Sequence, residues 1–297
     1  MGIEVEARVA GVSGSILRKL LSTESEWNPK VIVGRVVVRI LPDSFLHRVK
    51  KSYYAYLMKH VPEDWAEKDA FVVQHLISPG DCVIDIGANL GQYSRLLSRW
   101  VGPKGHVFAF EPIPETFDFL SNNIRKLRLT NVEPVNFALS DAEKTTTMVI
   151  PTYRWGAECW YDAQMKTDRK NTRALREIQV RSMKLDSFFD ECRSTPSPIT
   201  FIKCDVNFHE LAVLRGALRT ILAWHPAMLI EVFPDPDDAA TTAFETFELL
   251  RAAGLKPYVF DGTKLVPRKS GERSQNYFFL APRHLTALEA SQLVRAA

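Results

Sequence analysis

Apolar runs of strand length alternate with longer amphipathic segments from about residue 71 to residue 281. In the longer segments Leu, Phe, Ile and Val recur three or four positions apart, so one stripe of each would face a sheet. This alternation is typical of an α/β domain built on a mostly parallel sheet. Strands are predicted at 82–86, 106–110, 132–139, 200–205, 227–232, 256–260 and 276–280, and helices at 92–101, 114–127, 209–222 and 241–254.

Two stretches depart from this alternation. Residues 143–198 form a long connection with strands predicted at 145–150 and 178–185, and connections of that length are usually functional or disordered. Before residue 71, a strand-like run at 31–40 precedes a helix-like segment at 44–61. The run suits either a small accessory sheet or a contact in a homo-oligomer. We therefore divide the chain into an N-terminal accessory extension, a main domain and a C-terminal helix or tail, at 1–70, 71–285 and 286–297.

The charge of the chain is nearly balanced, with 38 Lys and Arg against 35 Asp and Glu and a formal charge of +3. A nucleic-acid partner is not expected from these figures, because dedicated nucleic-acid binders carry a strong basic excess. No apolar run approaches the roughly 20 residues of a membrane span, and the N-terminus lacks the basic and apolar blocks of a signal peptide. We expect a cytoplasmic protein whose four widely spaced cysteines are reduced.

The strongest local signal is a Gly-x-x-x-Gly turn that follows a predicted strand. Asp85 stands just inside the strand, and Gly87 and Gly91 permit a tight strand-to-helix reversal with close approach of a ligand to the backbone. Glu111 ends the next apolar strand, where a carboxylate is placed to accept hydrogen bonds from both hydroxyls of a ribose. Together these residues indicate a site for an adenosine-containing cofactor.

The middle of the turn distinguishes between adenosine cofactors. A pyrophosphate site needs a second glycine so that the backbone can meet the phosphates, whereas this chain has Asn89. Asp85 would repel a phosphate but suits a cationic amino group, although it could instead only cap and order the turn. S-adenosylmethionine carries a ribose, an amino acid moiety and a sulfonium but no phosphate. The turn therefore favours this cofactor over NAD, and a methyltransferase over an NAD-dependent oxidoreductase.

Further motifs follow the turn along the chain. The turn and these motifs lie at 85–94, 109–124, 131–141, 185–189, 201–217, 229–232 and 276–279. They resemble the FkbM-type family of class I S-adenosylmethionine-dependent methyltransferases. The resemblance implies a three-layer, Rossmann-like sheet of seven strands whose last strand, at 276–280, inserts antiparallel. It also implies methylation of a hydroxyl on a sugar, polyketide or similar small molecule. In this chain S-adenosylmethionine would then contact Asp85, Gly87, Asn89, Gly91, Glu111, Pro112, Ala138 and Ser140.

One motif departs from the family pattern. The family usually reads Ile-Asp-Val-Glu-Gly-x-Glu after the fourth strand, whereas this chain retains Asp205 and Glu210 but has Asn207 and Phe208 in place of Glu and Gly. If the missing acid normally positions or deprotonates the acceptor, the protein has changed its acceptor chemistry or lost it. A cofactor-binding but catalytically silent partner protein is therefore the alternative to an active methyltransferase.

Candidate catalytic groups gather where the fourth and fifth strands end, at the carboxyl edge of the sheet. Methyl transfer to an alcohol needs alignment, and removal of the hydroxyl proton by a nearby His or carboxylate. Asp205, which closes a strand, and His209, whose ordinary pKa of about 6.5 suits a base, are the leading candidates. Each also has a structural explanation, since Asp205 could only cap the following helix and His209 could lie in solvent.

The acceptor is expected to be a small molecule of acidic or glycosidic character. The basic segment 166–184 would attract an acidic acceptor, although such a run is more often a solvated surface. Trp155, in an aromatic-rich stretch, suits stacking on a sugar, and Asn207 and Glu231 are further candidates for acceptor contact. Asp205, Asn207 and Glu231 could also be imagined as a Mg²⁺ site, but their spacing is not diagnostic, and we expect no metal.

Overall fold

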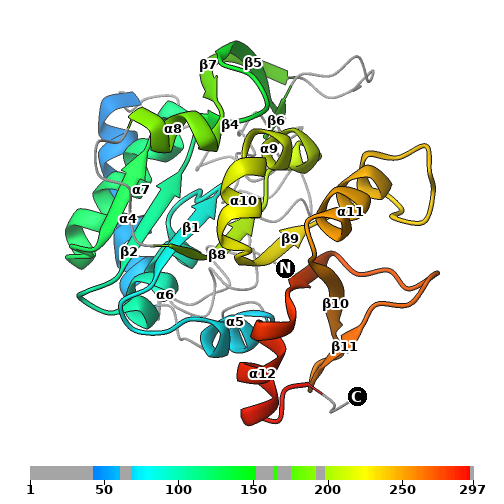
Figure 1. Cartoon of the computed structure of the whole chain (residues 1–297). Helices are drawn as coiled ribbons and strands as arrows, with labels where there is room; N and C mark the ends of the chain where they lie inside the picture. Colours follow the sequence, from blue (N-terminus) through cyan, green and yellow to red (C-terminus); the bar gives the residue numbers. More distant parts are fainter. Residues whose placement is uncertain (1–42, 61–67, 152–162, 166–174, 192–197, 295–297) are drawn as a thin grey trace, which may run out of the picture.

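A computed structural model of the chain describes residues 43–60, 68–151, 163–165, 175–191 and 198–294. Within these ranges, one large sheet is covered by helices on both faces, and a smaller sheet lies over one end of it (Figure 1). This is the α/β class that the sequence predicts. The strand expected at 31–40, Trp155 and most of the basic segment 166–184 lie outside the described residues.

The large sheet consists of eight strands among the described residues: β1 (Cys82–Ile86), β2 (His106–Phe110), β3 (Val132–Val135), β8 (Ile199–Cys204), β9 (Ala227–Glu231), β10 (Lys256–Phe260), β11 (Leu265–Pro267) and β12 (Asn276–Leu280). Their order is β11-β10-β12-β9-β8-β1-β2-β3. The strands from β3 to β9 in this order run parallel, whereas β12 inserts antiparallel between β9 and β10. Six of the seven predicted strands and the antiparallel last strand are confirmed, and the seventh, at 132–139, is confirmed only for its first part, β3. The additional strand, β11, extends the sheet as a hairpin partner of β10.

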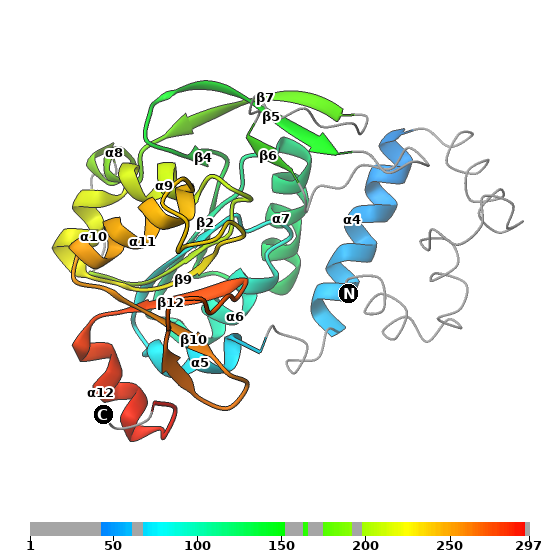
Figure 2. The same ribbon diagram turned by 90° about the vertical axis from the view of Figure 1, so that its right-hand side faces the viewer.

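Helices pack on both faces of this sheet (Figure 2). Alternate residues of a strand point to opposite faces, so Val83 joins the core on one face while Ile84 joins the core on the other. The face that receives Val83 is covered by α5 (Ala70–Leu76), α6 (Gln92–Val101), α7 (Pro114–Leu127) and α12 (Pro282–Ala290). The opposite face is covered by α8 (Leu185–Glu191), α9 (Glu210–Gly216), α10 (Leu218–Trp224) and α11 (Thr242–Ala252).

The long connection 143–198 supplies three of the four described strands of the smaller sheet. These strands are β4 (Ala138–Leu139), which precedes the connection, β5 (Lys144–Pro151), β6 (Gln164–Met165) and β7 (Leu175–Met183), in the order β4-β7-β5-β6. The strands predicted at 145–150 and 178–185 are confirmed as β5 and β7, which pair antiparallel along their whole length. Ile150 and Val180 lie in the small core beneath this sheet. The smaller sheet covers the carboxyl end of the large sheet. Ligand sites of α/β domains lie at this end.

One predicted strand, 132–139, is wrong as a single element. It is divided between the two sheets, with β3 ending at Val135 and β4 beginning at Ala138. Between them, Asn136 Nδ2 donates to the carbonyl oxygens of Glu111 and Pro112 at 2.8 and 3.1 Å. These bonds turn the chain away from the large sheet, and Ala138 then pairs with β7.

The helix predicted at 209–222 is likewise two helices, α9 and α10, which meet at Ala217. Gly216 ends α9 in close contact with the backbone of Ser140, because a Cβ atom at this position would lie 1.9 Å from the Ser140 carbonyl oxygen. The glycine therefore permits the close approach of α9 to the segment after β4. A glycine also favours the end of a helix.

The helix predicted at 44–61 is confirmed as α4 (Asp43–His60), which lies outside α7 (Figure 2). Asp118 of α7 accepts hydrogen bonds from His47 Nε2 at 2.5 Å and from Lys51 Nζ at 2.6 Å. Because Asp118 is half exposed, packing of Met58 against Phe119 and Leu90 contributes more to this contact than the ion pairs do.

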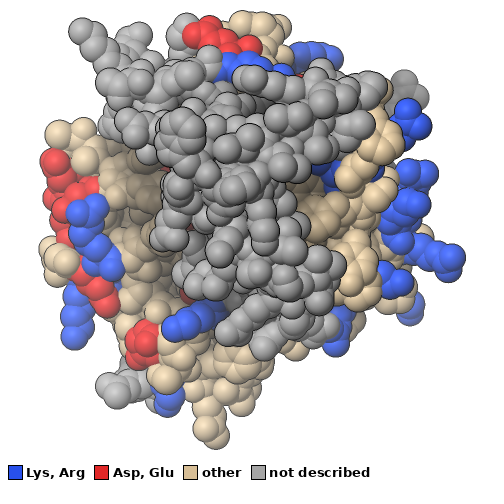
Figure 3. Space-filling model, turned by 180° about the vertical axis from the view of Figure 1, so that it is seen from behind, with Lys and Arg blue, Asp and Glu red and all other residues tan. Residues whose placement is uncertain are grey.

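Seen from behind, Lys and Arg side chains gather on the side where α4 and α7 lie (Figure 3). No helix in the described part of the chain is long and apolar enough to span a bilayer.

Candidate functional site

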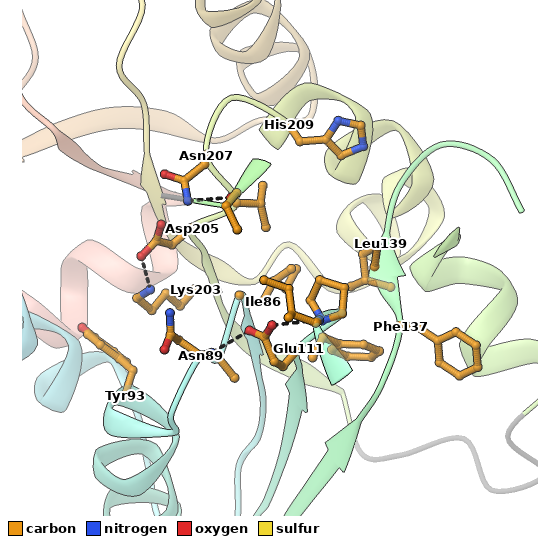
Figure 4. A pocket seen from close by; sticks show the side chains of 18 of the residues that line it. Ile86, Asn89, Tyr93, Glu111, Phe137, Leu139, Lys203, Asp205, Asn207 and His209 are labelled. Carbon is orange, nitrogen blue, oxygen red and sulfur yellow. Dashed lines mark hydrogen bonds and ion pairs between the residues drawn. The ribbon is translucent and has the colours of Figure 1, made fainter. Parts of the chain in front are cut away.

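The described residues form a cavity at the carboxyl ends of β1, β2 and β8, beneath the smaller sheet. The turns that follow these three strands supply its polar groups, and β4, β5 and β6 close it from above. In Figure 4, Asn89, Glu111, Lys203 and Asp205 point toward one another, and His209 lies on the side opposite Tyr93. The predicted site residues that line this cavity are Gly87, Asn89, Glu111, Pro112, Ala138, Asp205, Asn207 and His209.

Gly87 holds the first two of these turns close to the third. Its N–H donates to the Phe110 carbonyl oxygen at 3.0 Å, and the Asp205 N–H donates to the Ile86 carbonyl oxygen at 3.1 Å. Gly87 has a φ of +80°, and a Cβ atom there would lie 1.9 Å from the Asp205 carbonyl oxygen. Only glycine meets both requirements, the left-handed backbone and the absence of a side chain.

Asn89 occupies the position at which a dinucleotide turn has its second glycine. Its backbone is left-handed, with a φ of +50°, and its N–H donates to Glu111 Oε2 at 3.0 Å. Its Oδ1 atom is buried and has no hydrogen-bond partner among the described residues. An unpaired buried acceptor beside a cavity suits a polar ligand that carries a donor. Gly91 does not line the cavity; it begins α6 with a φ of +87° and lies against Leu120 of α7.

Glu111 is the carboxylate best placed for a ribose. It is 4% exposed, it lines the cavity, and its Oε1 and Oε2 atoms accept the backbone N–H groups of Ile113 and Asn89, both at 3.0 Å. Burial raises its pKa to about 7 against the opposing effect of these two hydrogen bonds, and the nearby carboxylates Asp85 and Asp205 raise it further. Each carboxylate oxygen has a second lone pair, so the side chain can still accept a pair of ligand hydroxyls.

Asp85 lies behind the cavity rather than on its surface. It is fully buried, and its Oδ2 atom accepts the Ser94 hydroxyl of α6 at 2.6 Å. Burial raises its pKa, while the charge of Lys203 and the hydrogen bond from Ser94 act in the opposite direction. The structure thus places Asp85 where it orders the turn and the start of α6, without direct access to a cofactor amino group.

Asp205 is tied to two neighbours on the cavity wall. Its Oδ2 atom accepts Lys203 Nζ at 2.9 Å, and it shares a hydrogen bond with Glu231 at the end of β9. Burial raises its pKa, but the charge of Lys203 and the two hydrogen bonds outweigh this effect and hold the pKa below its ordinary value. Glu231 does not line the cavity and acts on it through Asp205.

Lys203 is a cavity residue to which we assigned no role from the sequence. It is 6% exposed, and its ammonium group lies 5.2 Å from the centre of the Tyr93 ring. A lysine inside an otherwise apolar strand is the sequence signal that could have identified it, because a buried cation requires a partner. Among the described residues that line the cavity it is the only Lys or Arg. Because Lys203 is paired with Asp205, the described part of the cavity lacks a cationic side chain available to bind a phosphate, which argues against NAD.

The motif that departs from the family has an unusual backbone. Asn207 and Phe208 both have left-handed φ values, +50° and +73°. Such a conformation costs a residue with a side chain about 1–2 kcal/mol. Asn207 Nδ2 donates to the Ala163 carbonyl oxygen at 3.1 Å, and Phe208 N–H donates to Glu210 Oε1 at 3.0 Å. A glutamate at position 207 could not donate the first of these bonds, so the amide gives this chain a link between the motif and the segment before β6.

His209 belongs to a chain of hydrogen bonds that ends on Asp141. Its Nε2 atom lies 3.0 Å from Ser140 Oγ, and the Ser140 hydroxyl donates to Asp141 Oδ1 at 3.3 Å. With the single Ser140 proton directed to Asp141, Nε2 is the donor to Ser140, and the lone pair of Nδ1 is the proton acceptor. Burial lowers the pKa of His209, while the charge of Asp141 opposes the shift. Ser140 itself does not line the cavity; it orients His209.

The described residues contain no group of three His, Cys, Asp or Glu side chains arranged to hold a metal ion. Asp205 and Glu231, two of the three residues that could be imagined around Mg²⁺, bond to each other. The donor set of the cavity instead suits an uncharged ribose beside an apolar surface. That surface comes from Ile86, Leu96, Phe110, Ile113, Leu139 and Met148.

Comparison with solved structures finds methyltransferases. An FkbM methyltransferase from Methylobacillus flagellatus KT is 15% identical, with a TM-score of 0.43 over 84% of this chain and 59% of that chain. An O-methyltransferase from Bacillus cereus, solved with S-adenosylhomocysteine, is also 15% identical, with a TM-score of 0.43 over 81% of this chain and 91% of that chain.

Two curated relatives are similar over shorter stretches. A hexuronic acid methyltransferase from Haloferax volcanii is 28% identical over 173 residues, which cover 56% of this chain and 65% of that protein. A protein-L-isoaspartate O-methyltransferase from Aeropyrum pernix is 36% identical over 76 residues, or 26% of this chain and 28% of that protein. The chain thus spans less than two thirds of the length of either relative. The methyltransferase FkbM domain matches residues 85–257, which is more than half of the chain. The protein therefore belongs to the FkbM methyltransferase family, whose cofactor is S-adenosylmethionine.

Proposed function

We propose that the protein transfers a methyl group from S-adenosylmethionine to a hydroxyl oxygen of a small biosynthetic intermediate, and that this acceptor is a sugar acid. The observation that carries the proposal is Glu111, a buried carboxylate held by two backbone N–H groups on the wall of the cavity. The similarity to the Haloferax hexuronic acid methyltransferase supports the acceptor class.

The cofactor would be held by the first two turns of the cavity. When bound, S-adenosylmethionine supplies a methyl group activated by a sulfonium. Glu111 would accept the ribose hydroxyls, and the apolar side chains of Ile113 and Leu139 would cover the adenine. The buried carboxylates around Lys203 give this end of the cavity an acidic character that suits a cationic ligand.

His209 is the group that we propose as the proton acceptor. Its lowered pKa keeps the imidazole neutral at physiological pH, and the Ser140–Asp141 chain fixes its tautomer and favours the imidazolium that forms. Asp205 is a weaker base, because Lys203 lowers its pKa and occupies one of its oxygens. We therefore assign Asp205 a positioning role, in which it keeps Lys203 and the turn after β8 in place.

Replacing Glu111 with alanine tests the cofactor site. The carboxylate would lose its hydrogen bonds to the ribose, and the loss of even one bond to a charged group costs about 1.5–3 kcal/mol, so S-adenosylhomocysteine should bind at least about 10-fold more weakly. Isothermal titration calorimetry measures the affinity. The wild-type affinity should also rise from about pH 6 to about pH 8, because binding uses the ionised carboxylate and the pKa of Glu111 is raised to about 7.

The Glu111→Gln variant is the matched control for the pH effect. It keeps the shape of the side chain but does not titrate, so its affinity should change much less with pH than that of the wild type. Circular dichroism establishes that both variants are folded. A folded wild-type protein that binds neither S-adenosylmethionine nor S-adenosylhomocysteine would overturn the proposed function.

The departure at Asn207 and Phe208 favours one alternative, a cofactor-binding partner protein without catalytic activity. The two hypotheses differ in turnover and not in cofactor binding. A panel of sugar acids, neutral glycosides and other hydroxylated metabolites, assayed with radiolabelled methyl donor, separates them. Methylated product from any acceptor excludes the silent protein, whereas cofactor binding without turnover across the panel favours it.

A further inference from the structure

Phe208 is a large aromatic residue at a backbone position that favours glycine. Its φ of +73° lies in the left-handed region, and the family motif has glycine there. Asn207 before it is left-handed as well. Strain of this kind persists where the surrounding structure imposes it, and it is concentrated at functional sites. The contacts of the Phe208 ring should therefore explain why this position has a phenylalanine and not a glycine.

Burial in the core does not explain the ring, because Phe208 is 40% exposed. It lies against Phe233, which follows β9, with 5.1 Å between the ring centres and 34° between the ring planes. The residues on either side of Phe208 in the chain, Asn207 and His209, both line the cavity. The two rings thus form an aromatic surface beside the cavity, at the end where we place the proton acceptor.

A cation accompanies the aromatic pair. Arg273 Nη2 donates to the Phe233 carbonyl oxygen at 3.1 Å, which holds an exposed guanidinium at the backbone of the residue that carries this ring. The neighbouring acid Asp237 is held by both terminal nitrogens of Arg268, at 2.9 and 2.6 Å, and by the Gly271 N–H. The negative charge of Asp237 is thereby directed to Arg268 rather than to Arg273.

We propose that Phe208, Phe233 and Arg273 form the subsite that binds the acceptor ring outside the methyl-transfer cavity. The aromatic faces would cover the apolar face of a pyranose, and the Arg273 guanidinium would meet a carboxylate on that ring. This inference rests on the proposed function, and it assigns the acceptor subsite to residues of this chain. It also explains why the chain tolerates a strained phenylalanine, since glycine at position 208 would remove the aromatic surface.

The test compares the binding of two acceptor probes at saturating S-adenosylhomocysteine. Methyl glucuronide carries the carboxylate and methyl glucoside does not, and calorimetry or NMR titration gives the affinity of each. Phe208→Gly should weaken binding of both probes about 3- to 10-fold, while its affinity for S-adenosylhomocysteine stays unchanged. Phe208→Tyr should restore probe binding. Arg273→Gln should weaken binding of methyl glucuronide alone, until it binds no better than methyl glucoside.

Two controls separate this subsite from a structural role. Leu222→Ala on α10 removes a similarly exposed apolar side chain, 49% exposed, that does not line the cavity, and it should leave probe binding unchanged. The melting temperature of Phe208→Gly should not fall, because glycine relieves the left-handed backbone. A purely structural phenylalanine would instead lower the melting temperature and leave probe affinity intact, which would overturn the inference.

Failure of the subsite is distinguishable from failure of the proposed function. Loss of the subsite alone would appear as wild-type binding of S-adenosylhomocysteine with equal probe affinities in wild type and Phe208→Gly, or with no probe binding at all. Failure of the proposed function would appear earlier, as absence of cofactor binding by the folded wild type.

Discussion

Replacing Gly87 with alanine is expected to destabilise the fold by about 3 kcal/mol or more, the largest stability effect of any single substitution proposed for this chain. Two independent causes add. The φ of +80° costs a residue with a Cβ atom about 1–2 kcal/mol. The new Cβ atom would also lie 1.9 Å from the Asp205 carbonyl oxygen, which is backbone and cannot rotate away. Relief of that clash requires β1 and the turn after β8 to separate.

Gly80→Ala is the matched control for the backbone effect. Gly80 has a φ of +98° but nothing within 4 Å of its Cβ position, so this variant carries the conformational cost without the clash. Urea denaturation gives the free energy of unfolding for both variants. Equal destabilisation of the two variants would contradict the steric part of the prediction. Failure of Gly87→Ala alone to yield folded protein would agree with it.

Separation of the turns should also weaken cofactor binding by Gly87→Ala protein that does fold. Gly87 accommodates the carbonyl of Asp205, and the Asp205 side chain holds Lys203, which also lines the cavity. Binding of S-adenosylhomocysteine should remain intact in Gly80→Ala, because Gly80 lies outside the cavity. The pair of variants therefore tests whether the close approach at Gly87 serves the site as well as the fold.

The strands, the larger helices and the cofactor turn could be predicted from the sequence because each carries a local signal. Buried parallel strands read as apolar runs, and the strand that contains Ile84 and Ile86 ends in glycines whose positive φ values the structure shows. Glu111 could be predicted for the same reason, since its place at a strand end fixes its place at the carboxyl edge of the sheet. Family resemblance added the antiparallel direction of β12, which no local signal specifies.

The direction of side chains could not be predicted, and the roles of several site residues depend on it. Asp85 and Ser140 both belong to motifs that carry the resemblance, yet one lies behind the cavity and the other beneath His209. A one-residue change of phase decides which face of a strand a side chain occupies. The division of 132–139 between two sheets depends on Asn136, whose bonds to the β2 turn are a tertiary contact. Contacts of this kind leave no periodic trace in the sequence.

The contacts of Asn207 and Phe208, taken together, explain the change from the family motif at these two positions. The amide of Asn207 donates to the Ala163 carbonyl, which a carboxylate could not do, and so links the turn to the smaller sheet. Phe208 places a ring beside Phe233 at the same turn. Both changes replace charge or flexibility with fixed contacts at the end of the cavity assigned to the acceptor. They agree with the proposal of an altered acceptor recognition in which His209 removes the proton.

His209→Gln is accordingly expected to lower kcat by about 10²- to 10⁴-fold, the usual contribution of a general base. Glutamine keeps a polar side chain of similar size, so the affinity for S-adenosylhomocysteine should not change. In the wild type, kcat should fall at acidic pH as the imidazole becomes protonated. Because burial lowers the pKa of His209, this fall should lie below the ordinary histidine range of about 6.5.

Ser140→Ala tests whether the base is oriented by its neighbours. It removes the acceptor for His209 Nε2 and the link to Asp141 but does not touch the cavity surface. A smaller loss of kcat than in His209→Gln is expected. The pH at which kcat falls on the acidic side should also shift, because the nearby charge of Asp141 raises the pKa of His209. Steady-state kinetics across the pH range measure both effects. Full activity of His209→Gln would assign proton removal to another group, and Asp205, as the remaining carboxylate on the same turn, would then be tested by Asp205→Asn.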